Sequence, residues 1–219
     1  MKNLSNRLLA IADMVRFSGL VDIGSDHAHL PIYLIGAGRC ARALATDISP
    51  KSLAKGRENA AAAGLCGQID FQLARGFALA LSAEAYETCV IAGMGGENIM
   101  GIIKDAPKVA KGFKQLILSP QRDAPALRRF LHEFGFKIVN EVMVSENGKF
   151  YNILDCAPGT QEAYDEAGYA FGQALIERNC PILAQFIKSE LRKFEEIHKY
   201  IKLCEEILYV QNEGNRRGD

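Results

Sequence analysis

Short apolar runs that alternate with segments of helical spacing constrain this chain more than any other feature. Between residues 20 and 118, five runs of four to six residues are each typical of a buried strand, and helical segments separate most of them. Strands separated by helices predict an α/β fold with a doubly wound, parallel sheet. The expected strands cover residues 20–24, 41–46, 69–73, 88–92 and 115–118.

Two further apolar runs, residues 136–144 and 150–155, follow this alternation. They are joined through Asn147-Gly148, a dipeptide that favours the tight turn of a hairpin, so these two strands are predicted to be antiparallel. The sheet is therefore expected to have seven strands. The expected helices cover residues 4–17, 28–36, 49–63 and 125–134, with another from the Gly-rich turn at 93–96 to about residue 104.

The pattern changes after Pro158-Gly159, which marks the best candidate for a domain boundary. Apolar residues from Leu183 to Leu208 recur at alternating spacings of four and three, the heptad pattern of a coiled coil, with Glu190 as a polar interruption. Asn179-Cys180-Pro181 breaks the helical pattern, so a helical hairpin is predicted, with a first helix over 161–178. A single long helix is the alternative. We expect one domain over residues 1–158 and a helical coiled-coil domain over residues 159–219.

Charge and cysteine content exclude some classes of function. The 26 Lys and Arg residues equal the 26 Asp and Glu residues, so no global field attracts nucleic acid or an anionic membrane. Residues 1–160 carry a net charge of +3 and residues 161–219 a net charge of −3, so a polyanion would meet the first part more readily. The six cysteines are scattered without a Cys-x-x-Cys pair, and no apolar run could span a bilayer. We expect a cytoplasmic protein without metal or membrane, of open oligomeric state.

The segment Val21–Leu30 (VDIGSDHAHL) carries the strongest local signal for a ligand site. A strand ends in a single glycine, Gly24, and a turn of small and polar residues opens a helix. This is not the glycine-rich cradle of a pyrophosphate, but one glycine still lets the backbone approach a nucleoside. Asp22 and Asp26 favour a cation such as S-adenosylmethionine (SAM), which carries a sulfonium and an ammonium group. A structural turn with Asp26 as a helix cap is the alternative.

Two more segments follow strands that are expected to end at the same edge of the sheet. Asp47 ends the second strand, where a carboxylate can accept hydrogen bonds from both ribose hydroxyls of a nucleoside. Ile91–Gly96 (IAGMGG) follows the fourth strand and keeps side chains away from the floor of a cleft. Together with the first loop, these segments indicate nucleoside binding.

These motifs resemble those of the bacterial TrmK family of tRNA methyltransferases, which place a methyl group on N1 of adenine 22. The resemblance implies a Rossmann-like class I SAM-dependent methyltransferase domain with a C-terminal α-helical coiled-coil hairpin. It implies SAM as cofactor and tRNA as substrate. The motifs that carry it lie at residues 4–8 (LSNRL), 22–28 (DIGSDHA) with Leu30-Pro31, 45–48 (ATDI), 91–96 (IAGMGG), 146–151 (ENGKFY) and 179–183 (NCPIL).

The resemblance and the motifs together give a set of expected site residues. Asp26 is our first candidate for a carboxylate that favours the positive charge developing on the base, and His27 for handling a proton. Both have structural alternatives, a helix cap and a buried histidine. The residues expected to bind the cofactor are Arg7, Asp22, Gly24, Ser25, Asp26, Asp47, Ile48, Arg75, Gly76, Ala92, Gly93 and Met94.

RNA is expected to be held by the positively charged first domain, through Lys104, Lys108, Arg122 and Arg128. Tyr151 could stack on a flipped base, with packing on the sheet as its alternative. Two other functions stay open at this point. The chain could be a SAM-dependent methyltransferase that acts on another RNA or a small molecule, or a non-enzymatic nucleoside-binding adaptor.

Overall fold

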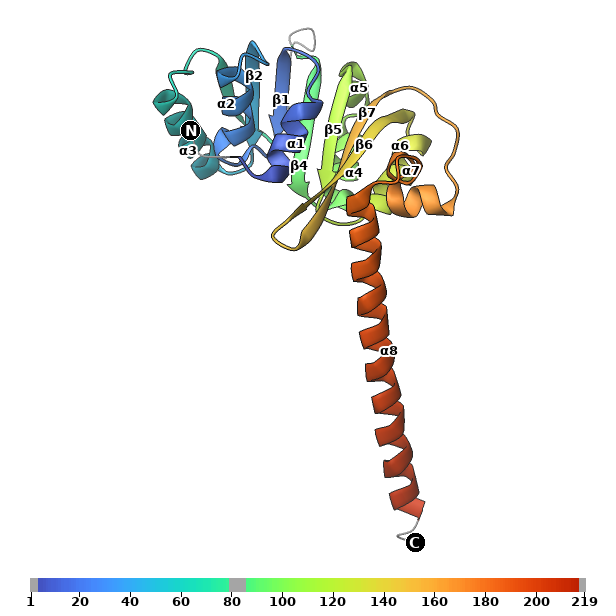
Figure 1. Ribbon diagram of the computed structural model, residues 1–219. Coiled ribbons are helices and arrows are strands. Elements are labelled where there is room, and N and C mark those ends of the chain that lie inside the picture. Colours follow the sequence, from blue (N-terminus) through green and yellow to red (C-terminus); the bar gives the residue numbers. More distant parts are fainter. Residues whose placement is uncertain (1–3, 79–85, 217–219) are drawn as a thin grey trace. The chain divides into compact units, whose positions relative to one another are not determined.

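The computed structural model describes residues 4–78 and 86–216 and contains one seven-stranded sheet (Figure 1). Its strand order is β3-β2-β1-β4-β5-β7-β6. The first five strands in this order are mutually parallel, and β7 pairs antiparallel with both β5 and β6, which confirms the predicted sheet. The strands are β1 (Gly19–Ile23), β2 (Arg42–Asp47), β3 (Ile69–Leu73), β4 (Thr88–Met94), β5 (Gln115–Pro120), β6 (Phe136–Glu146) and β7 (Lys149–Pro158).

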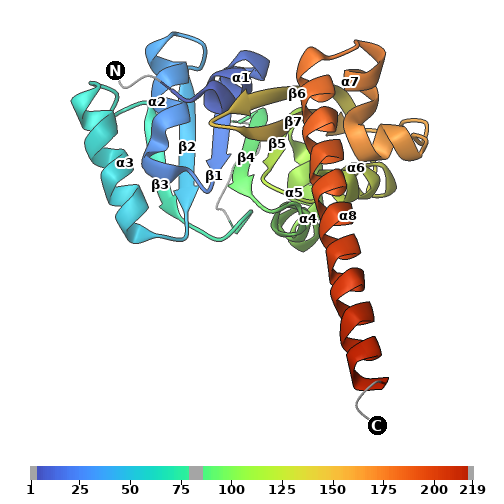
Figure 2. The same ribbon diagram turned by 60° about the horizontal axis from the view of Figure 1, so that its bottom comes forward.

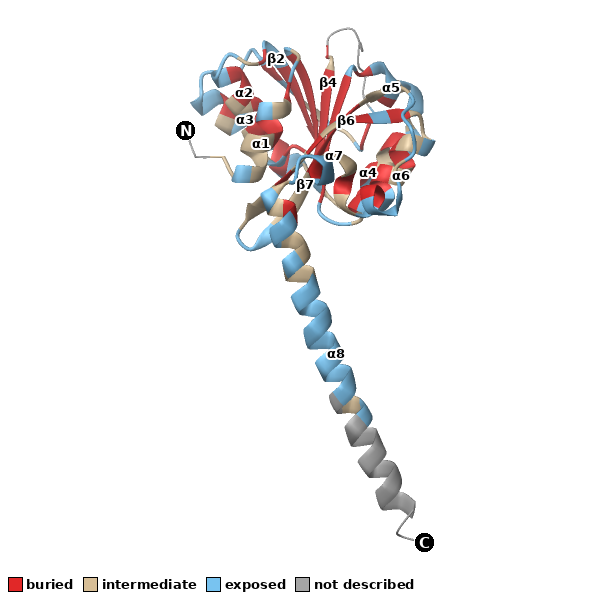
Figure 3. Ribbon diagram, turned by 45° about the vertical axis from the view of Figure 1, so that its right-hand side comes forward, coloured by how far each residue is buried: buried red, intermediate tan, exposed pale blue. Residues whose placement is uncertain are grey.

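Helices cover both faces of the sheet, as Figure 2 shows. Alternate residues of β1 point to opposite faces: Leu20 packs in the core beneath α1 and α2, whereas Val21 and Ile23 pack in the core beneath α4 and α6. The buried residues of Figure 3 follow these two layers. The helices of these layers are α1 (Asn6–Met14), α2 (His29–Gly36), α3 (Pro50–Ala62), α4 (Gly96–Asp105), α5 (Pro107–Gly112) and α6 (Ala124–Glu133).

Local sequence signals explain several of these boundaries. The Ser49 side chain accepts a hydrogen bond from the Ser52 amide, and Pro50 occupies the first turn of α3. In the β6–β7 hairpin, Asn147 and Gly148 both have positive φ, +51° and +73°, as the predicted tight turn requires. The short helix α5 was not predicted. Pro107 opens it, and it buries Ala110 in the core beside α4.

The C-terminal part differs from the prediction. The chain divides into compact units at Met1–Arg178 and Asn179–Asp219, so the boundary lies about 20 residues after Pro158. Residues 161–178 do not form one long helix. They form a π-helix over Gly168–Gly172 and the short helix α7 (Gln173–Glu177). The second unit contains the long helix α8 (Pro181–Arg216).

The reason for the shifted boundary is a set of polar contacts between residues 161–178 and the sheet domain. The buried Arg128 guanidinium donates to the backbone carbonyls of Tyr169 and Ala170, at 2.7 and 3.1 Å. The Gln161 side chain accepts a hydrogen bond from the Ile138 amide at 2.8 Å. These contacts make residues 161–178 part of the first unit. Across residues 4–78 and 86–216, no helix is long and apolar enough to cross a membrane.

Candidate functional site

A cavity of about 1200 Å³ opens at the carboxyl ends of β1, β2 and β4. This is the edge at which open α/β sheets bind ligands, because the strand order reverses there. Most of the residues predicted to bind a cofactor contribute to its lining. They are Gly24, Asp47, Ile48, Arg75, Gly76, Ala92, Gly93 and Met94.

The loop after β1 lies close to both of its neighbouring strands. The Gly24 and Ser25 amides both donate to the Thr46 carbonyl of β2 at 2.8 Å, which fixes the loop against that strand. Gly24 has a φ of +73°, and a Cβ at this position would lie 2.6 Å from Cε of Met94. A side chain at this φ would be strained, and the end of the Met94 side chain would have to shift to admit it, so the single glycine of the motif is explained mainly by its backbone conformation.

Asp47 reaches the cavity from the end of β2, as predicted. Its carboxylate accepts hydrogen bonds from the Ser49 amide at 2.8 Å and from the Ser52 hydroxyl at 3.2 Å. These two contacts join Asp47 to the first turn of α3 and hold the carboxylate in one orientation beside Gly24 and Ile48. Asp47 thus has both a structural contact and a half-buried position in the cavity lining.

Asp22 and Ser25, also predicted to bind the cofactor, are buried and do not contribute to the described lining. Asp22 lies within β1, and burial raises the pKa of its carboxyl from 3.8 to about 6, with the charge of Asp47 acting in the same direction. Asp22 is thus a buried carboxyl that precedes Ile23 and Gly24, the two residues of this segment that line the cavity.

Arg7 lies beside the cavity rather than in its lining. Its guanidinium faces Gly93, where a Cβ would lie 3.6 Å from Nη1, and its Cζ lies 5.2 Å from the centroid of the Tyr151 ring. Arg7 Nη1 is buried and has no hydrogen-bond partner among the described residues. Nearby, the Asn6 amide donates to Glu146 at 2.6 Å, which joins α1 to the β6–β7 hairpin. A buried donor of this kind suits an anionic ligand group.

Asp26 and His27, the candidate catalytic residues, follow Gly24 on a turn of 3₁₀ helix over Asp26–Ala28. Their side chains are 82% and 44% exposed, and Asp26 Oδ1 lies 3.5 Å from His27 Nε2. Neither residue contributes to the described lining of the cavity. The N-cap position of this turn is held by Ser25, not Asp26, and Ser25 makes no side-chain capping hydrogen bond there. Their catalytic roles stay predictions.

One face of α4 supplies cavity residues that sequence reasoning missed. Glu97 and Asn98 lie one turn before Gly101 and Ile102, and Asp105 lies one turn further on. The spacing of four residues, directly after IAGMGG, was the available signal for this face. With Asp47, the carboxylates of Glu97 and Asp105 make the lining acidic, which suits a cationic ligand.

The predicted RNA-binding residues lie in different environments in the structure. The prediction for Arg128 is wrong: it is 1% exposed and forms a salt bridge of 2.7 Å with Glu141, so it cannot reach a phosphate. Arg122 is 76% exposed and lies at the loop after β5, next to Gly95. Lys104 lies at the end of α4 with Nζ 5.2 Å from the centroid of the Phe130 ring, and Lys108 is exposed on α5. Tyr151 faces Arg7 rather than lying free.

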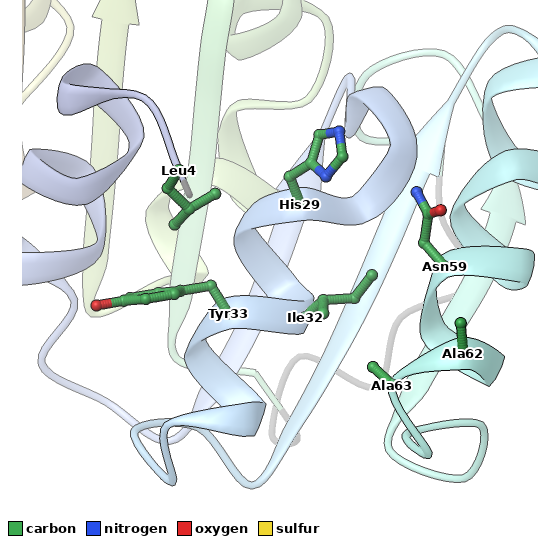
Figure 4. A pocket seen from close by; sticks show the side chains of 7 residues that line it. All are labelled: Leu4, His29, Ile32, Tyr33, Asn59, Ala62 and Ala63. Carbon is green, nitrogen blue, oxygen red and sulfur yellow. The ribbon is translucent and has the colours of Figure 1, made fainter. Parts of the chain in front are cut away.

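A second, smaller cavity of about 340 Å³ lies at the outer surface of the helices α2 and α3 (Figure 4). Tyr33, Ile32 and Leu4 give it a mainly apolar lining, and His29 and Asn59 lie at the end nearest the Asp26–Ala28 turn. Within the described residues, no group of three or more His, Cys, Asp or Glu side chains is arranged to hold a metal ion. All six cysteines are free thiols.

The strand order, the antiparallel β7 and the cavity beside β1, β2 and β4 define a Rossmann-like class I methyltransferase fold. The model of one protein family matches residues 20–215, and this family is TrmK, tRNA (adenine(22)-N(1))-methyltransferase. The chain belongs to the TrmK family.

Individual relatives agree with this assignment. The chain is 29% identical over 204 residues to the tRNA (adenine(22)-N(1))-methyltransferase of Bacillus subtilis, covering 90% of this chain and 85% of that protein. The crystal structure of the B. subtilis m1A22 tRNA methyltransferase TrmK aligns with a TM-score of 0.81 and 25% identity, over 92% of this chain and 88% of that one. A Streptococcus pneumoniae protein solved in complex with SAM aligns with a TM-score of 0.83 and 33% identity, over 88% and 90%.

Proposed function

We propose that this protein transfers a methyl group from SAM to N1 of adenine 22 in tRNA, in the cytoplasm. The observation that carries the proposal is the acidic cavity of about 1200 Å³ at the carboxyl ends of β1, β2 and β4, in a chain of the TrmK family. The relative from S. pneumoniae binds SAM, and the relative from B. subtilis is an m1A22 tRNA methyltransferase.

The residues of the cavity fit SAM. Asp47 would accept hydrogen bonds from the ribose hydroxyls, and the glycines Gly24 and Gly93 leave room for a close ligand. The buried Arg7 Nη1, which has no partner among the described residues, would donate to the carboxylate of the cofactor. Glu97 and Asp105 suit its positive groups. When bound, SAM supplies an electrophilic methyl group on a sulfonium.

The protein's own task in this reaction follows from the chemistry of adenine. N1 has a lone pair and needs no base before it is methylated, whereas the methylated base is cationic and loses a proton from N6 more easily. The protein must therefore orient the base, exclude water and favour the developing positive charge. We assign the last role to the Asp26 carboxylate and the acceptance of a proton to His27.

The tRNA is the partner that the family implies, and we propose contacts to it through exposed cations of the first unit. These cations are Lys104, Lys108 and Arg122. Arg128 is no longer included because it is buried. Tyr151, next to Arg7, is our candidate for stacking on the base. Coiled-coil pairing of α8 also stays a prediction, but residues 161–178 belong to the first unit and do not supply the first helix of the predicted hairpin. The heptad residues Phe194, Ile197 and Ile201 on α8, which are exposed, support the coiled-coil pairing.

The test is to incubate the protein and isotopically labelled SAM with an unmodified tRNA transcript, and to map modified nucleosides by mass spectrometry. We expect one labelled N1-methyladenosine at position 22. A transcript with guanine in place of adenine 22 is the matched control and should receive no label. Label at another position, or on small acceptors but not on tRNA, would contradict the proposal.

A further inference from the structure

The turn that carries Asp26 and His27 has an unusual backbone. His27 and Ala28 both have left-handed conformations, with φ of +59° and +56°, and neither is a glycine. Such conformations are sparsely populated by residues with a Cβ and persist only where their surroundings enforce them. Two successive left-handed residues between β1 and α2 therefore require contacts that hold the turn in this conformation.

Helix α3 provides that restraint through one of its faces. Ser52, Gly56 and Asn59 are spaced by four and three residues, so they lie on the same side of the helix. The Asn59 side chain donates from Nδ2 to the His27 carbonyl at 3.0 Å. Figure 4 shows Asn59 on α3, opposite His29 at the start of α2.

The other two residues of this face set the distance between α3 and the turn. At Gly56, a Cβ would lie 3.3 Å from Cβ of Ala28 and 2.7 Å from Cε1 of Phe71, so only glycine fits without displacement. The Ser52 hydroxyl lies 3.5 Å from the Ser25 carbonyl and 3.2 Å from Asp47 Oδ2. Ser52 thus contacts a cofactor residue as well as the turn, whereas Asn59 reaches the turn alone and does not line the large cavity.

We propose that Asn59 is a positioning residue for methyl transfer, because its amide holds the left-handed His27 carbonyl and so fixes the direction of the Asp26 and His27 side chains. The proposal rests on the proposed function. It separates Asn59 from the cofactor residues: loss of this hydrogen bond should slow the transfer step without weakening the binding of SAM. Asn59 acts through the turn and does not itself touch the reacting atoms.

The experiment compares Asn59→Asp, which keeps the shape but places an acceptor against the carbonyl, with Asn59→Ala. Glu58→Gln, an acid-to-amide change at the neighbouring exposed position, is the matched control. For each protein, SAM and tRNA dissociation constants are measured by titration, and the methyl-transfer rate by single-turnover kinetics with both substrates saturating. Thermal unfolding identifies a temperature at which all variants are folded, and all rates are compared there.

We expect both Asn59 variants to transfer the methyl group at least tenfold more slowly, with both dissociation constants within twofold of wild type, and Glu58→Gln to match wild type. If Asn59→Asp does not fold, the proposal requires the same slow transfer and unchanged dissociation constants of Asn59→Ala alone. Transfer at the wild-type rate would overturn the proposal, and so would a parallel loss of SAM affinity, which would make Asn59 a support of the cofactor cavity. If wild type transfers no methyl to tRNA, the proposed function itself fails, and this proposal falls with it.

Discussion

Asp22 places a titratable carboxyl within a strand whose five residues are all buried. Its pKa is about 6 in the folded protein against 3.8 for an ordinary aspartate, so between these pH values the folded chain binds more protons than the unfolded chain. The free energy of unfolding therefore falls as the pH rises from about 4 to about 6, and the charged form is the less stable one above that range.

Asp22→Asn should remove this penalty. We expect the variant to gain stability over wild type as the pH rises from 4 to 7, by up to about 3 kcal/mol, since one pKa unit corresponds to about 1.4 kcal/mol. Urea unfolding of the ligand-free proteins at several pH values measures the difference. A difference that does not depend on pH would contradict the raised pKa.

Asp47→Ala should weaken SAM binding by about 1.5–3 kcal/mol, the cost of losing hydrogen bonds to a charged group. Isothermal titration calorimetry measures the SAM affinity of the variant and of the wild type. Because Asp47 also contacts the start of α3, a control is needed for damage to the helix. Ser49→Ala removes the N-cap hydrogen bond of α3 and should lower stability by about 1 kcal/mol while leaving the SAM affinity unchanged. Unchanged affinity in Asp47→Ala would remove Asp47 from the site.

Asp26→Asn should lower the single-turnover rate of methyl transfer more than it lowers SAM affinity. The side chain keeps its shape and loses its charge, and at 82% exposure it contributes little to packing. Asp13→Asn, a similarly exposed position that pairs with Arg39, is the matched control. A wild-type rate in Asp26→Asn would leave the carboxylate without a catalytic role.

Cavity residues on strand ends could be predicted from sequence because several short apolar runs each end in a glycine or an acid, and the carboxyl ends of parallel strands meet at one edge of the sheet. Gly24, Asp47 and Gly93 were found in this way. The cavity face of α4 was missed because Glu97 and Asp105 look like the ordinary solvated side of an amphipathic helix. The burial of Arg128 could not be predicted, since its partner Glu141 lies on another element, β6, and nothing in the sequence pattern pairs the two residues.

At the scale of elements, the contact between α6, β6 and residues 168–172 depends on Arg128. Its guanidinium bonds Glu141, Asn152 and the carbonyls of Tyr169 and Ala170. Arg128→Ala should cost about 3–5 kcal/mol, because it leaves the buried Glu141 charge unpaired. The double variant Arg128→Met/Glu141→Leu should be less destabilised than Arg128→Ala. Chemical denaturation measures both, and equal stability of Arg128→Ala and wild type would contradict the role.

The strands were predictable to within a few residues because buried parallel strands are short and uniformly apolar. Residues 161–178 were misread for a physical reason. Their composition favours a helix, but Arg128 takes the carbonyls of Tyr169 and Ala170 for its own hydrogen bonds, and Gly172 has a φ of +94°. Tertiary contacts thus override local propensity in this segment.

At the scale of the whole molecule, two truncations should behave differently. Removal of residues 179–219 leaves the first unit complete, so we expect it to fold, to bind SAM as wild type does, and to methylate tRNA at least tenfold more slowly. Recognition of a folded RNA requires several separated contacts, which α8 would supply. Calorimetry and single-turnover assays test this, and a wild-type rate on tRNA would contradict it.

Truncation after Pro158 is the comparison. It also removes Gln161 and the carbonyls that Arg128 binds, so it should lower the unfolding temperature well below that of the first truncation. Equal unfolding temperatures would show that residues 159–178 do not stabilise the first unit.

On α8, changing Lys188, Arg192 or Lys199 alone should alter the rate of tRNA methylation little.

The attachment of α1 to the far end of the sheet domain also has a consequence for biosynthesis. The Met14 carbonyl accepts from Gln115, Arg16 pairs with Asp155, and the Asn6 amide reaches Glu146. Residues 6–16 thus have these partners among strands made some 100 to 140 residues later. Asp13 of α1 can pair with Arg39 early, but these longer-range partners of α1 exist only once β7 has been translated, and contacts of such sequence separation make folding slow. We therefore expect the Arg7 guanidinium to settle beside Gly93 late in folding, so that a nascent chain would complete the proposed cofactor site last.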